Sequence, residues 1–326
     1  MYDNLRLIMS EPFRNEAERE SFISRFALFV KDEKKGIYHN KGYETLSQNK
    51  GVYIRFEVGT GLGRGRIVLC FSLHKFYNAM RTGRLFNYNR FGFDEANEAS
   101  RMLCGLLGLD LSEAVVKKYE IGVNVPTEKP PEIYMRELDF IGIKGRQYRI
   151  IEDRKHKEYK LYGTHSEKGK RIVYIFYDKT YEARSKIKDE ARRQKVPENI
   201  LRVEMDVQRP TEKIVFSQLF DPVYQSMLKH EFRQRFTCDL HYKELPVKLT
   251  GLTGKQMEVY RYLCEMGETD TIEYYRSLWK RKFISRDQYR YAVSTLSTIQ
   301  QKILKLPVSI SPEATFLLGQ MNRILS

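Results

Sequence analysis

The chain has 326 residues, of which 41% are hydrophobic and 30% charged, and its formal net charge is +15. This composition excludes an intrinsically disordered chain and leaves room for one large or two ordinary folded domains. The sequence contains no long apolar run and no signal-peptide pattern at its N-terminus, which argues against a membrane protein and for a cytoplasmic one.

The excess positive charge predicts a polyanionic partner, because lysines and arginines that neutralise phosphates release counterions. A charged protein without such a partner is the alternative. The four cysteines are widely spaced and form no CxxC pair, so the sequence indicates neither a zinc knuckle nor a disulfide framework. Composition therefore favours nucleic acid as the partner.

Residues 1–50 are polar and irregular, and we expect them to form an N-terminal segment with one helix over 15–30. Two strands follow, over 52–58 and 66–77, and both alternate between apolar and polar residues. The glycine-rich link between them lacks the GK[ST] of a phosphate loop, so we interpret it as a hairpin loop. Arg64 and Arg66 in this link, and Lys75 beyond it, are candidate contacts to a DNA backbone.

Between residues 94 and 208 the hydrophobic pattern predicts two helices, over 94–107 and 181–195. It also predicts strands over 115–125, 171–179 and 200–208, and two short strands near 147–151 and 159–162. The basic run with Arg154, Lys155 and Lys157 suits phosphate contact. This order predicts an α+β fold: an antiparallel sheet with helices on one face, of ferredoxin-like or palm type. Its open face would carry the ionisable side chains, namely Arg55, Glu57, Ser72, His74, Glu120, Arg202 and Glu204.

The C-terminal part has a different pattern. Residues 211–248 are interpreted as a helical linker, and 249–326 as three short helices that resemble a winged-helix or helix-turn-helix unit, with a break at Gly267. A helical appendage packed on the first domain is the alternative. The basic third helix and the turn before it favour DNA, through Arg281, Lys282, Arg286 and Arg290.

The strand over 171–179 ends on Tyr177, with Lys179 two residues later on the same side. A tyrosine held in this way is a candidate nucleophile towards DNA phosphate, with Lys179 or Arg202 stabilising the charge. Glu120 and Glu204, with His74, are candidate ligands for Mg²⁺ or Mn²⁺, because these ions prefer oxygen donors. Core packing of the tyrosine and cross-strand ion pairs of the carboxylates are the alternatives.

Four short motifs follow one another along the chain: Ser72–Asn78, Tyr119–Val125, Ile175–Lys179 and Leu201–Asp206. In this order and spacing the chain resembles the rolling-circle replication initiators of the filamentous-phage gene-two type and their staphylococcal-plasmid relatives, over residues 51–210. The resemblance implies a metal-dependent nickase that attaches to the 5′ end of DNA through a tyrosine and later rejoins the strand. It places the nucleophile on Tyr177, ahead of Tyr181 and Tyr174.

The resemblance also implies origin DNA as the substrate, a host helicase and polymerase as further partners, and a bacterial cytoplasm. The chain has no His-hydrophobic-His pair, so the metal site rests on the carboxylates with His74. Two other functions stay open. A non-catalytic, winged-helix origin-binding protein would bind DNA without cutting it, and an RNA-binding sheet would expose aromatic residues instead of ionic ones.

Overall fold

The computed structural model describes residues 2–32, 35–40, 48–59, 65–142, 148–149, 151–152, 160–167, 170–246, 252–303 and 308–325. The chain forms two compact units. The sheet unit comprises Met1–Tyr242 and Glu313–Ser326, and the helical unit comprises Lys243–Pro312. This division differs from the predicted domains 1–50, 51–210, 211–248 and 249–326, because the first fifty residues, the predicted linker up to Tyr242 and the C-terminal helix belong to the sheet unit.

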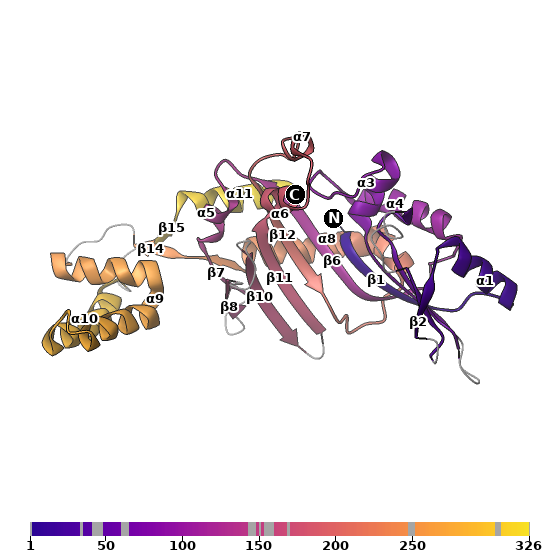
Figure 1. The fold of residues 1–326 in the computed structure, drawn as a ribbon. Coiled ribbons are helices and arrows are strands. Elements are labelled where there is room, and N and C mark those ends of the chain that lie inside the picture. The colour runs from indigo at the N-terminus through magenta and orange to yellow at the C-terminus, as the bar shows by residue number, and fades with distance from the viewer. Residues whose placement is uncertain are drawn as a thin grey trace. The chain divides into compact units, whose positions relative to one another are not determined.

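A ten-stranded antiparallel sheet dominates the sheet unit (Figure 1). Its strand order is β2-β3-β4-β5-β1-β6-β12-β11-β10-β9. In chain order the strands are β1 (Tyr2–Ser10), β2 (Phe29–Asp32), β3 (Ile37–His39), β4 (Tyr53–Glu57), β5 (Arg66–Ser72), β6 (Val115–Pro126), β9 (Ile151–Glu152), β10 (Lys160–Glu167), β11 (Lys170–Asp178) and β12 (Ile200–Val207). The predicted α+β class with an antiparallel sheet is confirmed.

We expected the N-terminal segment to be irregular. Instead it supplies the central strand β1 and the two strands at one edge of the sheet, β2 and β3. Leu5 and Leu7 of β1 are buried, while Arg6 between them is exposed. This alternation is the period-two pattern of a strand with one covered face. The predicted helix over 15–30 is shorter than expected, since α1 (Glu16–Arg25) ends before β2 begins.

The two faces of the sheet differ in chemistry. On one face the apolar side chains of β6, β11 and β12 are covered by η1 (Phe216–Phe220), α8 (Pro222–Arg233) and the π-helical turn η2 (Gln234–Cys238). Phe236 of η2, for example, contacts Tyr174 and Phe176 of β11, with ring centroids 5.7 Å apart in both pairs. The opposite face carries the ionisable side chains that alternate with these apolar ones, as the strand pattern predicts.

Helices begin where β5 and β11 end. β5 stops at Ser72, whose hydroxyl caps α3 (Leu73–Thr82), so the predicted strand over 66–77 is too long. β11 stops at Asp178, whose carboxylate caps α6 (Lys179–Ser185), and the predicted helix over 181–195 is two short helices, α6 and α7 (Glu190–Arg193). In the antiparallel order, β5 and β11 run in the same direction and β1 runs opposite to both. The C-terminal ends of β5 and β11, with their caps, therefore lie at the same end of the strands as the start of β1.

The remaining elements of the sheet unit are α4 (Phe93–Leu107), α5 (Pro131–Met135), α11 (Pro312–Leu325) and a three-stranded sheet of β13 (Leu240–Tyr242), β7 (Leu138–Ile141) and β8 (Tyr148–Arg149). α11 returns to this unit through a ring contact between Phe316 and Tyr134.

The helical unit consists of α9 (Gly254–Lys280), α10 (Arg286–Ile303) and a two-stranded sheet of β14 (Glu244–Pro246) and β15 (Val308–Ile310). Its core is formed by Val259, Ala292, Leu296 and Ile299. The predicted break at Gly267 is wrong, because α9 runs through it without interruption. A glycine inside a helix costs only about 1 kcal/mol, which the packing of α9 on α10 offsets. None of the helices in the described ranges is long and apolar enough to cross a membrane.

Candidate functional site

Three carboxylates meet on the polar face of the sheet. Asp3, Glu120 and Glu204 come from the adjacent strands β1, β6 and β12, and one oxygen of each lies within 4.8 Å of the others. All three side chains are buried. Three buried acids this close repel one another, so the arrangement needs compensating positive charge. We call these residues the acidic cluster.

Arg202 supplies part of that charge from within the cluster. Its Nε donates to Glu204 Oε1 at 2.8 Å and its Nη2 donates to Asp3 Oδ2 at 2.9 Å. Its Nη1 donates to Asn124 Oδ1 at 3.2 Å. The guanidinium lies close to Gly122, where a Cβ atom would stand 2.6 Å from Nη2, so any larger residue there would displace Arg202 from these bonds. Glu204 and Asp3 raise the pKa of Arg202 against the effect of burial.

Asp3 reaches the cluster because β1 contains a bulge. Between Tyr2 and Leu5 the pairing of β1 with β6 shifts by one residue, and such bulges re-aim side chains. Asp3 accepts hydrogen bonds from the Ser72 hydroxyl and, at 2.7 Å, from Asn87 Nδ2. Burial disfavours its charge, but Arg202 and the Ser72 hydroxyl lower the pKa of Asp3 to about 2. Asp3 is therefore ionised at neutral pH.

Glu120 is the least compensated member of the cluster. Asn4 Nδ2 donates to its Oε2 at 2.9 Å, while its Oε1 is buried without a hydrogen-bond partner. Burial, followed by Glu204 and Asp3, raises the pKa of Glu120 well above its ordinary value. A buried oxygen without a donor is unfavourable unless a proton or a cation satisfies it. The cluster thus fits a hard divalent cation such as Mg²⁺ or Mn²⁺, which takes oxygen ligands.

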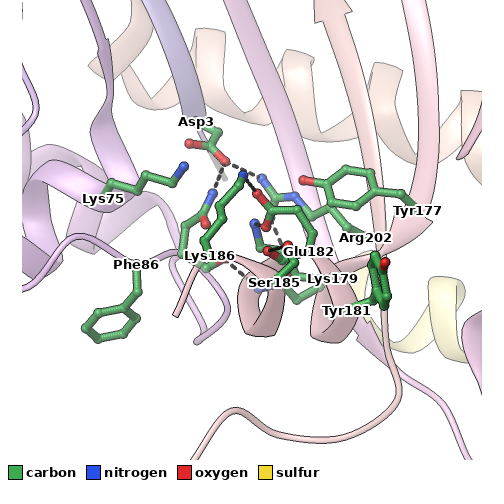
Figure 2. A network of polar contacts seen from close by, with 12 residues as sticks. Asp3, Lys75, Phe86, Tyr177, Lys179, Tyr181, Glu182, Ser185, Lys186 and Arg202 are labelled. Atoms are coloured by element: carbon green, nitrogen blue, oxygen red, sulfur yellow. Dashed lines mark hydrogen bonds and ion pairs between the residues drawn. The ribbon is translucent and has the colours of Figure 1, made fainter. Parts of the chain in front are cut away.

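Tyr177 lies directly beside the cluster. Its hydroxyl donates to Glu204 Oε1 at 2.9 Å, and Figure 2 shows that hydroxyl turned towards Arg202. Burial and Glu204 raise the pKa of Tyr177 well above its ordinary value. Of the three candidate tyrosines, Tyr174 packs on the opposite face against Phe236, and Tyr181 is 47% exposed at the start of α6.

Lys179 follows Tyr177 as the first residue of α6 and is buried. Its ammonium lies 2.7 Å from Glu182 Oε2 and 5.6 Å from the centre of the Tyr177 ring. Lys186 also pairs with Glu182 (Figure 2). Burial and the nearby Arg202 lower the pKa of Lys179 to about 7. Lys160 is a second cation beside the Tyr177 ring, with its ammonium 5.1 Å from the ring centre.

We expected His74 on a strand, but it lies on α3. Its Nε2 shares a hydrogen bond with Asn89 Oδ1 at 2.7 Å, and its ring stacks on Phe91 at 4.5 Å. Burial lowers the pKa of His74 to about 3, so the ring is neutral. The acidic cluster is completed by Asp3, which sequence analysis missed. The alternation of Leu5, Arg6 and Leu7 predicts a strand there, but not its pairing.

The predicted DNA contacts are distributed over both units. Arg66 pairs with Glu57, and Lys75 stands near Asp3 in Figure 2. Arg281, Lys282, Arg286 and Arg290 are exposed around the turn between α9 and α10 in the helical unit. Arg64, Arg154, Lys155 and Lys157 lie outside the described residues.

A hollow of about 660 Å³ opens beside Arg202 and His74. Its walls include Phe91, Asn124 and Ile200. Gly122 and Arg202 belong both to this lining and to the site, so the hollow borders the site beside the Arg202 side chain.

The chain matches no family model, no curated protein and no solved structure.

Proposed function

We propose that the chain initiates rolling-circle replication as a metal-dependent enzyme that nicks one DNA strand at an origin and later rejoins it. One observation carries the proposal: the hydroxyl of Tyr177 is 2.9 Å from Glu204, inside a cluster of three carboxylates. In this proposal the sheet unit is a palm-type nicking domain, and the helical unit assists as a DNA-binding, winged-helix-like part.

The residues that would hold the cation are Asp3, Glu120 and Glu204, with the unpartnered Oε1 of Glu120 as one ligand. A bound Mg²⁺ or Mn²⁺ supplies Lewis-acid stabilisation of the phosphate charge. Arg202 orients two of the three carboxylates through its bonds to Asp3 and Glu204. We therefore assign Arg202 a positioning role and Lys179 the role of cation beside the tyrosine.

In the nicking step, Tyr177 Oη forms a bond to phosphorus while the bond from phosphorus to the 3′ oxygen breaks. The phenolic proton passes to Glu204, which already accepts its hydrogen bond, and the 3′ oxygen takes a proton from water. The product is a 5′-phosphotyrosyl bond and a free 3′ hydroxyl. Attack of a 3′ hydroxyl on that bond reverses the step and rejoins the strand.

The test uses supercoiled plasmids that carry fragments of the DNA molecule encoding this chain, with Mg²⁺ or Mn²⁺. We expect nicked plasmid and a protein–DNA adduct, with mass spectrometry placing the DNA on the peptide that contains Tyr177. Tyr177→Phe should abolish both, whereas Tyr181→Phe, which changes an exposed tyrosine in the same way, should retain both. An adduct on another tyrosine, such as Tyr162 on the same face, would reassign the nucleophile. Absence of nicking with every fragment and both metals would refute the proposal.

A non-catalytic origin-binding protein is the second candidate. The observation that favours it is the turn between α9 and α10, where four exposed cations lie within seven residues of Phe283, which is itself 72% exposed. Such a surface contacts DNA phosphates without needing any catalytic group. This candidate predicts sequence-specific binding of the same fragments with the plasmids left intact.

A further inference from the structure

A second hollow, of about 560 Å³, lies on the polar face of the sheet. Three cations line it, Arg6 of β1, Lys118 of β6 and Lys75 of α3, and the lining contains no carboxylate. We call this hollow the basic basin. The proposed nicking step uses none of these cations. The net positive charge of the chain favours a polyanionic ligand, and the basic basin is a candidate surface for its phosphates.

The strand register builds the basin. Arg6 pairs with Cys70 of β5 on one side and with Lys118 of β6 on the other, so the three side chains share one face. Lys75 joins them from the first turn of α3, which starts directly after β5. The central strands therefore position Arg6 and Lys118, the helix that follows β5 positions Lys75, and no loop is involved.

The basin borders the acidic cluster. Two residues of its lining also bond to the cluster: Asn4 donates to Glu120, and Ser72 donates to Asp3. Of the three cations, Lys118 is partly neutralised, because its ammonium lies 2.9 Å from Asp206. Arg6 and Lys75 carry the positive charge that faces the hollow.

We propose that the basic basin binds the backbone phosphates of single-stranded DNA on one side of the scissile phosphate, with Arg6 and Lys75 as the principal contacts. The inference rests on the proposed function for the scissile phosphate and for the choice of a single strand, whereas phosphate binding by these cations needs no nicking chemistry. A single strand is the fitting ligand, because the reacting phosphate must approach Tyr177, which is 8% exposed. Contacts of this kind read the backbone and carry no base preference.

The first test measures binding of a fluorescent twenty-nucleotide oligothymidylate, without divalent cations, across a range of NaCl concentrations. The double substitution Arg6→Gln and Lys75→Gln should reduce the slope of log affinity against log salt by about 1.4, since each contact to a single strand contributes about 0.7. At physiological salt this corresponds to a loss of affinity of about ten-fold. The matched control is Arg101→Gln with Lys213→Gln, two exposed cations outside the basin lining.

A second readout uses the unsubstituted protein. Cys70 lines the basin, whereas Cys104 lies on α4 and Cys238 at the end of η2, both outside that lining. Saturating oligothymidylate should slow alkylation of Cys70 by N-ethylmaleimide, followed by mass spectrometry of its peptide, and leave the alkylation of Cys104 and Cys238 unchanged. This readout does not depend on whether a variant folds.

The inference is overturned if the double variant binds like the control pair, or if the oligonucleotide leaves Cys70 alkylation unchanged. The two proposals fail in different ways. If binding does not depend on the basin but nicking is intact, only the proposal for the basic basin is refuted. If binding depends on the basin but no fragment is nicked, the proposed nicking function is refuted, and the protein is one that binds single-stranded DNA.

Discussion

Glu120→Gln should make the metal-free protein more stable. The side chain is buried within 4.8 Å of the Asp3 and Glu204 carboxylates, and its Oε1 has no hydrogen-bond partner. Glutamine has the same shape, keeps an oxygen for Asn4 and removes the charge. A residue that lowers stability where it stands is the expected signature of a binding site, because function and stability place opposite demands on it.

The size of the effect follows from two considerations. Two charges 4.8 Å apart repel by about 3.5 kcal/mol at an effective dielectric constant of about 20. If Glu120 avoids that repulsion by holding a proton, the cost at pH 7 is limited to about 3.4 kcal/mol, since each pH unit above the ordinary pKa of 4.5 contributes at most about 1.36 kcal/mol. Asn4 and Arg202 offset part of this, so we expect a gain of about 1–3 kcal/mol.

The pH dependence has a definite sign. Because the folded-state pKa of Glu120 is raised, the folded protein holds more protons than the unfolded chain above pH 4.5. The contribution of Glu120 to the free energy of unfolding therefore falls as the pH rises through that window, and comparison with Glu120→Gln isolates it from other titrating groups such as His74. The advantage of Glu120→Gln should be small near pH 4.5 and grow until Glu120 ionises in the folded protein.

The assay is urea unfolding at pH 5 and pH 7.5 with a chelator present, followed by circular dichroism. The single tryptophan, Trp279, lies in α9, so its emission reports on the helical unit separately. Glu113→Gln, at an exposed position, is the matched control and should change the free energy of unfolding by less than about 0.5 kcal/mol. A variant less stable than the unsubstituted protein at pH 7.5, or a gain equal at both pH values, would show that Glu120 is not under electrostatic strain.

Three further predictions concern other parts of the molecule. Mg²⁺ at a hundred times its dissociation constant should raise the free energy of unfolding of the unsubstituted protein by about 2.7 kcal/mol, measured by urea unfolding, and a similar rise in Asp3→Asn would argue against the acidic cluster as the binding site. Phe236→Ala should cost about 3–5 kcal/mol of unfolding free energy, because this ring is fully buried, whereas Met227→Ala at a 52% exposed position should cost little. Tyr289→Leu should change the emission of Trp279, which stacks on that ring at 5.3 Å, and leave the unfolding of the sheet unit unaltered, as circular dichroism would report.

The sequence by itself determined which residues share a face of the sheet. Alternation along the strands predicts that Glu120, Arg202 and Glu204 lie on the polar side, and the structure brings these three together. It also predicts the antiparallel α+β class and a strand that ends close to Tyr177 and is followed by a helix. These features are local, because a side chain's face follows from its position in a strand of period two.

Only the tertiary structure decided what completes the site. Asp3 bonds to Arg202 across 199 positions of sequence, and no local pattern specifies that β1 pairs with β6 or that a bulge turns Asp3 inward. Sequence pattern also extended the strand through His74, because the cap at Ser72 that ends it is a hydroxyl common in strands as well. The basic basin has the same origin, since Arg6, Lys75 and Lys118 meet only once the central strands have paired. Strand pairing is set by burial over the whole sheet, and that free energy is not contained in any single segment.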